Sequence, residues 1–413
     1  MPHQHTSAPP LLTQAMVLLM AVATGLIIAS NYYAQPLLHA IGNEYGLSEA
    51  GAAIIVTVAQ SSYAVGLLLL VPLGDRLERR GLITSLTLIA AAGQALVAYG
   101  PGVGSILAGT AITGATSVVA QVMVPFAATL AAPQERGRVV GTIMSGLLLG
   151  ILLGRTVSGF LSDLGDWRTV YQVAAVLLVF VAASLRWVLP RHAGTSTMSY
   201  FALLRSVGTL FVQEPLFRAR SLIGALTFAQ FSVLWTSLTF LLVSPPYGYS
   251  NSTIGLFGLA GAAGAAAARL FGRMADRGHA NRSTRFGLWL LLLSWPLLWW
   301  GGVSVLGLLL GILLLDLAIQ AVHVTNQTCI YRLQPEARSR LAAGYMTSYF
   351  IGGAAGSLAS AAAYTHGGWL GVCILGLGLS LVVLLYGSLA PNARAAETPP
   401  ETSPEAASRP KAA

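Results

Sequence analysis

Three side chains that can carry charge lie inside long apolar stretches of this chain, and they are the residues that could do chemistry. They are Arg155, Asp316 and His323. A charge at the centre of a lipid bilayer costs about 2.5–3.5 kcal/mol or more, so such residues are functional candidates. Asp316, Gln320, His323 and Gln327 follow in steps of four, three and four, which places them on one face of a helix. Asp316 and His323 are the candidate proton carriers, because a carboxyl group and an imidazole can each take up and release a proton.

Other polar residues can be grouped with this face. Arg155 could bind an anionic ligand, or favour the ionised form of Asp316 until a proton binds. It could instead pair with Asp316 to hold helices together, or donate hydrogen bonds to backbone carbonyls. The polar and aromatic residues at 31–35 could line a ligand path or lie in the aromatic belt at the membrane surface. Gln121 lies 202 positions before His323, an offset that recurs in this chain. The candidate cavity residues are Arg155, Asn31, Tyr32, Tyr33, Gln35, Gln121, Gln320, Asn326 and Gln327.

The composition defines the class of protein that must position these residues. The chain has 413 residues, 55% hydrophobic content and a mean hydropathy of +0.70, which predicts an all-α integral membrane protein of about twelve spans. The net charge of +9 comes from arginines in loops and has no accompanying aromatic patch, so nucleic acid is not an expected partner. Cys329 and Cys373 fall in apolar spans, and we expect neither a disulfide nor a metal site. No catalytic motif is present, so an enzyme is not expected.

The expected spans alternate with loops that differ in charge. Arginines fall between even- and odd-numbered spans, acidic residues fall in the other loops, and Arg168 is the one basic exception. This pattern predicts that both termini are cytoplasmic. The predicted spans are 12–38, 50–73, 82–100, 104–131, 138–162, 168–189, 219–243, 252–272, 285–303, 305–331, 340–364 and 369–389.

Short motifs recur at a constant offset of 202 positions, which indicates two homologous halves of about six helices. We therefore predict a short cytoplasmic N-terminus at 1–11, bundles at 12–190 and 219–390, a cytoplasmic linker at 191–218 with an interfacial amphipathic helix, and a disordered tail at 391–413. The recurring pairs are Tyr45-Gly46 with Tyr247-Gly248, Pro133-x-x-Arg136-x-Arg138 with Pro335-x-x-Arg338-x-Arg340, Gly150-x-x-x-Gly154 with Gly352-x-x-x-Gly356, and Gly165-x-Trp167 with Gly367-x-Trp369.

The loop Asp75-Arg76-x-x-Arg79-Arg80, its fainter copy at Asp276-Arg277, the repeated halves and the long central connection together resemble the major facilitator superfamily. The resemblance covers residues 12–390. Gly141, Gly150 and Gly154 are similar to the glycine pattern of bacterial drug:proton antiporters, although Arg155 and Ser158-Gly159 depart from it. The expected fold is two six-helix bundles related by pseudo-two-fold symmetry.

The resemblance also implies a conformational latch on the cytoplasmic side. Asp75 would lie at the N-terminal end of the eleventh span near Arg340, where a helix dipole favours an acid. Arg76 and Arg79 would meet acidic groups such as Glu135 or Glu78. The remaining latch residues are Arg80, Asp276 and Arg277, and the glycines expected at a sliding helix interface are Gly141, Gly150, Gly154, Gly159, Gly352 and Gly356.

The expected function is secondary active transport of a small organic molecule by alternating access, in the form of proton-coupled efflux. A proton symporter or uniporter for uptake is the alternative, and a transport-inactive membrane sensor is a less favoured class. The energy source would be the proton gradient, with no cofactor. The partners would be the substrate and membrane lipid, the protein would be a monomer, and the location would be a bacterial-type inner membrane.

Overall fold

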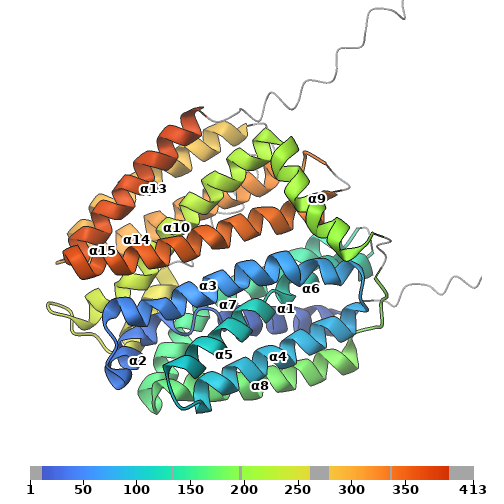
Figure 1. Ribbon diagram of the computed structural model, residues 1–413, viewed down its shortest axis with the longest axis horizontal. Helices are drawn as coiled ribbons and strands as arrows, with labels where there is room; N and C mark the ends of the chain where they lie inside the picture. Colours follow the sequence, from blue (N-terminus) through green and yellow to red (C-terminus); the bar gives the residue numbers. More distant parts are fainter. Residues whose placement is uncertain (1–11, 133, 195–197, 261–278, 335–336, 390–413) are drawn as a thin grey trace, which may run out of the picture.

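The structure is a computed structural model that describes residues 12–132, 134–194, 198–260, 279–334 and 337–389. These residues form helices and connections, and no strand occurs among them. Eight of the described helices are long and apolar enough to cross a membrane. In Figure 1, helices α1–α8 lie below, helices α10, α13, α14 and α15 lie above, and α9 crosses between them at the right.

The first half contains shorter helices than predicted at two places. Predicted span 12–38 is interrupted between α1 and η1, and span 104–131 is divided into α5 and α6. The bounds are α1 Gln14–Ala29, η1 Gln35–Leu37, α2 Leu38–Tyr45, α3 Glu49–Leu69, η2 Val71–Asp75, α4 Arg79–Tyr99, α5 Val103–Thr116, α6 Val119–Leu130, α7 Arg136–Leu164 and α8 Trp167–Val188.

The second half differs from the prediction at its start and its end. Helix α10 begins at Pro215, and the last two predicted spans join into α15, which has a non-helical residue at Gly368. Most of the predicted span 252–272 lies outside the described residues. The bounds are α9 Tyr200–Gln213, α10 Pro215–Val243, α11 Asn251–Leu256, η3 Phe257–Ala260, α13 Ala280–Trp300, α14 Val305–Ile330 and α15 Arg338–Leu389.

The repeated motifs recur as repeated structure. Gly46 and Gly248 both adopt the left-handed backbone conformation, with φ of 62° and 60°. Two residues later in each half, Ser48 and Ser250 cap the next helix by accepting a hydrogen bond from a backbone N–H. Glycine is suited to both turns because a Cβ disfavours positive φ.

The hydrophobic core is divided in the same way as the sequence. One cluster of buried residues lies wholly between Val17 and Leu189, and another lies wholly between Ile223 and Val383. A third cluster joins the two groups, and in it the Tyr63 ring lies 4.2 Å from the Phe350 ring between centroids. Helices α3 and α15 run side by side along this junction.

The linker helix α9 contacts both groups of helices. Leu203, Val207 and Leu210 are buried on one side, while Phe201 is 79% exposed on the other. The Tyr200 hydroxyl donates to the Leu69 carbonyl at 2.8 Å, which ties α9 to the end of α3. The helix is amphipathic, as an interfacial position would require.

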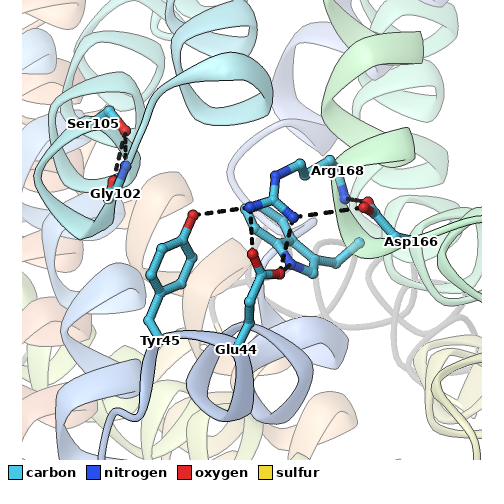
Figure 2. A network of polar contacts seen from close by, with 7 residues as sticks. Glu44, Tyr45, Gly102, Ser105, Asp166 and Arg168 are labelled. Carbon is cyan, nitrogen blue, oxygen red and sulfur yellow. Dashed lines mark hydrogen bonds and ion pairs between the residues drawn. The ribbon is translucent and has the colours of Figure 1, made fainter.

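The face opposite the arginine-rich loop carries a network around Glu44, shown in Figure 2. The Arg168 guanidinium donates to both Glu44 carboxylate oxygens, at 2.9 and 2.5 Å, and the Trp167 indole N–H donates at 2.6 Å. Hydrogen bonding to Arg168 lowers the pKa of Glu44; burial opposes the shift, and the Trp167 bond adds to it. The single basic exception in the loop charges is therefore half of an ion pair that joins α2 to α8.

We expect Glu44→Gln to lower the melting temperature in detergent by a few degrees at pH 7, because an ion pair this exposed contributes about 1 kcal/mol or less. The lowered pKa of Glu44 means that the stabilisation is present above the unfolded pKa near 4.5 and is lost as the pH falls through the folded pKa. The difference from the wild type should therefore disappear in acid. Glu135→Gln, at an exposed position, is the control. A difference that persists unchanged at pH 3.5 would contradict the pairing.

Candidate functional site

A cavity of about 340 Å³ lies between the two groups of helices. Its walls come from α1, α3, α6 and α7 on one side and from α10, α14 and α15 on the other. Most of the lining is apolar or aromatic, and the few polar groups converge from both sides, which is the usual character of a small-molecule site.

Arg155 of α7 is 2% exposed and is held from several directions. Its Nε donates to Gln35 Oε1 at 2.5 Å, and its Nη1 donates to the Ile151 carbonyl at 3.3 Å. Its Nη2 has no hydrogen-bond partner within the described part of the chain. Three rings surround the guanidinium carbon, with centroid distances of 4.1 Å for Trp235, 4.8 Å for Tyr32 and 5.3 Å for Phe231.

Asp316 of α14 lines the same cavity from the other side. Its Oδ1 is buried and has no hydrogen-bond partner among the described residues. Asp316 and Arg155 are close enough for their charges to interact, but they form no ion pair within 4.0 Å in the regions that the structure describes. The two charges therefore face one cavity without neutralising each other directly.

The other polar residues of α14 lie along the same wall. Gln320, His323 and Gln327 line the cavity with Asp316, and Gln121 lines it from α6. His323 Nδ1 is 3.1 Å from the Tyr345 hydroxyl, so the two share a hydrogen bond. The four residues that the sequence placed on one helix face therefore lie on one wall of the cavity.

Four predicted cavity residues do not line this cavity, namely Asn31, Tyr33, Gln35 and Asn326. Asn31 faces a small pocket within the first half with Gln94 and Tyr171. Tyr33 is buried in a hydrophobic cluster that lies mostly in that half and includes Phe240 of α10, and its carbonyl accepts from Ser158 Oγ at 2.7 Å. The break between Ala29 and Gln35 turns successive side chains in different directions, so that Tyr32 lines the cavity and Gln35 reaches Arg155.

Asn326 is also away from the cavity, because it lies about 100° around the helix from its neighbour Gln327. It accepts from Arg220 Nη1 at 3.3 Å. Arg220 is a buried arginine that the sequence analysis missed, and it also donates to Thr284 and Asn281. The predicted span began at residue 219 and placed Arg220 at its edge, whereas α10 begins at Pro215. A proline after Glu214 was the available signal, since proline is favoured in the first turn of a helix.

A second cavity of about 250 Å³ continues toward the arginine-rich face. It shares Gln121 and Met346 with the central cavity. Asp75 and Ser339 line it, so Asp75 lies at the N-terminal end of α15, and Arg340 lies within electrostatic range.

The predicted partners of the loop arginines are wrong. Arg79 lies 4.0 Å from Asp75 and donates to the Gly74 carbonyl and Thr129 Oγ1, while Arg76 is exposed. Glu78 instead caps α4 by accepting from the N–H groups of Arg80 and Gly81, because it immediately precedes that helix.

The charges around the loop follow from these contacts. Burial alone would raise the pKa of Glu78, but the backbone hydrogen bonds from Gly81, Arg80 and His192 lower it overall. The Arg80 side chain donates to the Leu189 carbonyl at 3.3 Å. Glu135 is exposed, and Asp276 and Arg277 lie outside the described residues.

Most of the predicted interface glycines pack within one half. A Cβ at Gly150 would collide with Gly25 of α1, and a Cβ at Gly352 would collide with Ala225 of α10. Gly154 and Gly356 make the next contacts along the same helix pairs, with Ala29 and Ala229. Gly159 alone of the six packs on the other half, against Asn251, and Gly141 has open space around it. The matched contacts show that α7 packs on α1 in the same way as α15 packs on α10.

Comparison with known proteins identifies the family. The family model described as Major Facilitator Superfamily matches residues 20–337. The chain belongs to the major facilitator superfamily. It is 58% identical to the transporter YgaY of Escherichia coli O157:H7, named as uncharacterized, over 374 residues that cover 91% of this chain and 95% of that protein.

Two further likenesses agree with the family. The Escherichia coli K12 inner membrane transport protein YnfM is 26% identical over 266 residues, covering 62% of this chain and 60% of that protein. The crystal structure of a bacterial homologue of the human lysosomal transporter Spinster, inward-facing and unoccupied, aligns with a TM-score of 0.75 at 14% identity, covering 94% and 98% of the two chains. This member of the superfamily is thus a multi-pass membrane protein whose function is transport.

The contact between Gln35 and Arg155 predicts a stability effect. Gln35→Leu should lower the free energy of unfolding by about 1.5–3 kcal/mol, because it leaves a buried cationic N–H without an acceptor. Adding Arg155→Met should restore part of the loss, since both partners are then apolar. Denaturation of the purified protein in detergent measures this cycle, with the exposed Gln213→Leu as control. Strictly additive losses in the double variant would show that the contact contributes nothing.

Proposed function

We propose that this transporter is a proton-coupled exporter that exchanges a small organic molecule for a proton by alternating access. The observation that carries the proposal is the Asp316 carboxylate, which faces the cavity between the halves with an unpaired buried oxygen. Such a group can carry a proton in one state and contact the substrate in the other. Competition between the two for one site would couple their movements in opposite directions.

The arrangement of cavities supports an inward-facing state. The central cavity continues into the second cavity beside Asp75, toward the arginine-rich face. On the opposite face the halves are joined by hydrogen bonds between α7 and α11: Thr156 donates to the Gly255 carbonyl at 2.9 Å, and Asn251 donates to Ser162 at 3.1 Å. A similar structure is named inward-facing. We propose that these α7–α11 contacts break when the protein turns outward.

The orientation and assembly are part of the same proposal. The arginines favour a cytoplasmic position for the face that carries the Asp75 loop and for both termini. We propose two six-helix bundles in a bacterial inner membrane, with the chain acting as a monomer. The name of YnfM as an inner membrane transport protein supports this location. Asp75, which lies 4.0 Å from Arg79 and lines one cavity with the start of α15, is the proposed latch: it would hold the cytoplasmic side closed and release when the halves rock.

The groups that face Asp316 define what its protonation would change. Arg155 presents a fixed positive charge from the other half, Trp235 lies between them, and Tyr349 lies within electrostatic range on α15. His323 lies two turns farther along α14. Protonation of Asp316 would remove the attraction between its carboxylate and Arg155. That change alters the electrostatic energy between the halves, as a coupling site must.

The fixed charge of Arg155 favours a second candidate, proton symport. If the substrate carries only negative charge, it would bind best when Asp316 is protonated, and the two would then move together. The direction of substrate movement relative to an imposed pH gradient separates symport from antiport.

We expect Asp316→Asn to abolish uphill transport driven by a pH gradient and to retain downhill exchange, because rocking and the other substrate contacts do not need that proton. The substrate is first identified by comparing metabolite and drug accumulation in cells with and without the protein. Proteoliposomes with an imposed pH gradient then measure both modes, with Glu135→Gln as control. Intact gradient-driven transport by Asp316→Asn would rule out the proton role and direct attention to His323.

A further inference from the structure

Each half presents one buried, incompletely paired charge to the shared cavity. Arg155 Nη2 comes from α7 and Asp316 Oδ1 comes from α14. We propose that the substrate is an amphipathic zwitterion, with a carboxylate that accepts from Arg155, an ammonium group that donates to Asp316, and an aromatic or branched apolar body. The proposal rests on the transport function proposed above and specifies its substrate class.

The arginine side of the site is complementary to a carboxylate group. An arginine stays protonated in proteins, so Arg155 cannot reduce the cost of its burial by losing its charge. Gln35 and the Ile151 carbonyl occupy Nε and Nη1. The surrounding rings of Tyr32, Phe231 and Trp235 stabilise the cation but leave Nη2 without a hydrogen-bond acceptor in the described chain. An anionic oxygen could therefore complete the set at Nη2.

The aspartate side is complementary to a cationic donor. Asp316 Oδ1 is a buried acceptor with no well-aligned donor among the described residues, and the Trp235 indole N–H, which lies close enough to act on this carboxyl group, does not reach hydrogen-bond geometry there. Arg155 does not supply the missing donor, because it lies beyond 4.0 Å. An ammonium group has three donors and can serve the carboxylate at short range.

The space between and beside the charges is suited to an apolar body. The Phe228 ring stacks on Phe231 at 5.2 Å and on Tyr349 at 4.1 Å between centroids, with interplanar angles of 14° and 19°. These three rings line the cavity and give its wall an apolar, aromatic surface. At about 340 Å³ the cavity lies at the small end of the range of about 300–1,000 Å³ for ligand sites.

A ligand with one charge fits less well. An organic anion would satisfy Arg155 but repel the Asp316 carboxylate, and an organic cation would do the reverse. Either would leave one buried charge without a direct partner, which is strongly unfavourable in an apolar setting. A zwitterion satisfies both and adds no net charge to the cavity.

Matched compounds test this class directly. Phenylalanine, phenethylamine and 3-phenylpropanoate share a ring and a chain and differ in their charged groups, as do tryptophan, tryptamine and indole-3-propanoate. Binding of each compound to the purified protein in detergent is measured by thermal shift and by calorimetry. We expect the zwitterion of at least one set to bind five-fold or more tightly than both of its analogues.

Variants of Asp316 and Arg155 show which charged group of the ligand each residue binds. Asp316→Asn should reduce the affinity for the zwitterion to that of the carboxylate analogue, and Arg155→Gln should reduce it to that of the amine. Arg155→Lys, which keeps the positive charge, should retain part of the preference and shows whether the site still folds. The exposed Arg205→Gln and Glu135→Gln are the matched controls and should bind as the wild type does.

Equal binding by a singly charged analogue, or no binding by any of the six compounds to the folded protein, would overturn the proposal. A preference for zwitterions that survives both Asp316→Asn and Arg155→Gln would also overturn it. The measurement uses no membrane and no pH gradient. A failure of proton coupling would therefore leave the binding result unchanged, and a failure of zwitterion binding would leave proton coupling to be judged in proteoliposomes.

Discussion

The buried charge of Arg155 is the constraint on which the site depends. A charge at the bilayer centre costs about 2.5–3.5 kcal/mol or more, and an arginine cannot avoid that cost by deprotonation. The chain offsets it with an amide from η1, a backbone carbonyl of α7 and three aromatic rings, and each ring contributes about 0.5–2 kcal/mol. Two of those rings belong to α10, in the other half. The arginine therefore ties the halves together at the place where they enclose the cavity.

The interruption between α1 and η1 makes this arrangement possible. In a continuous helix, Tyr32 and Gln35 would project along one stripe. The break instead turns Tyr32 to the cavity, directs Gln35 to Arg155 and exposes the Gln35 carbonyl to Thr239 of α10 at 2.6 Å. Consecutive residues in this segment therefore serve the cavity, the core of the first half and the junction between the halves.

The sequence predicted the parts of the fold that depend on a period or an offset. The offset of 202 positions anticipated matching turns at Gly46 and Gly248, and the spacing along α14 put Asp316, His323 and both glutamines on one wall. It did not reveal the break in the first helix, because polar residues at 31–35 are as typical of the end of a continuous span as of an interruption within it. It missed Arg220 because the predicted span began four residues after the true start of α10, and it missed the ring pair from α10 because burial beside a distant helix leaves no local pattern.

We propose that the contacts between α7 and α11 form a gate that must open for transport. Ser162→Cys combined with Asn251→Cys, in a background with Cys329→Ala and Cys373→Ala, replaces two side chains that now share a 3.1 Å hydrogen bond. Transport of the identified substrate is measured in proteoliposomes before oxidation, after oxidation and after reduction. If the gate must open, cross-linking stops transport and reduction restores it, while neither single cysteine variant responds. Full transport by completely cross-linked protein would contradict alternating access through this face.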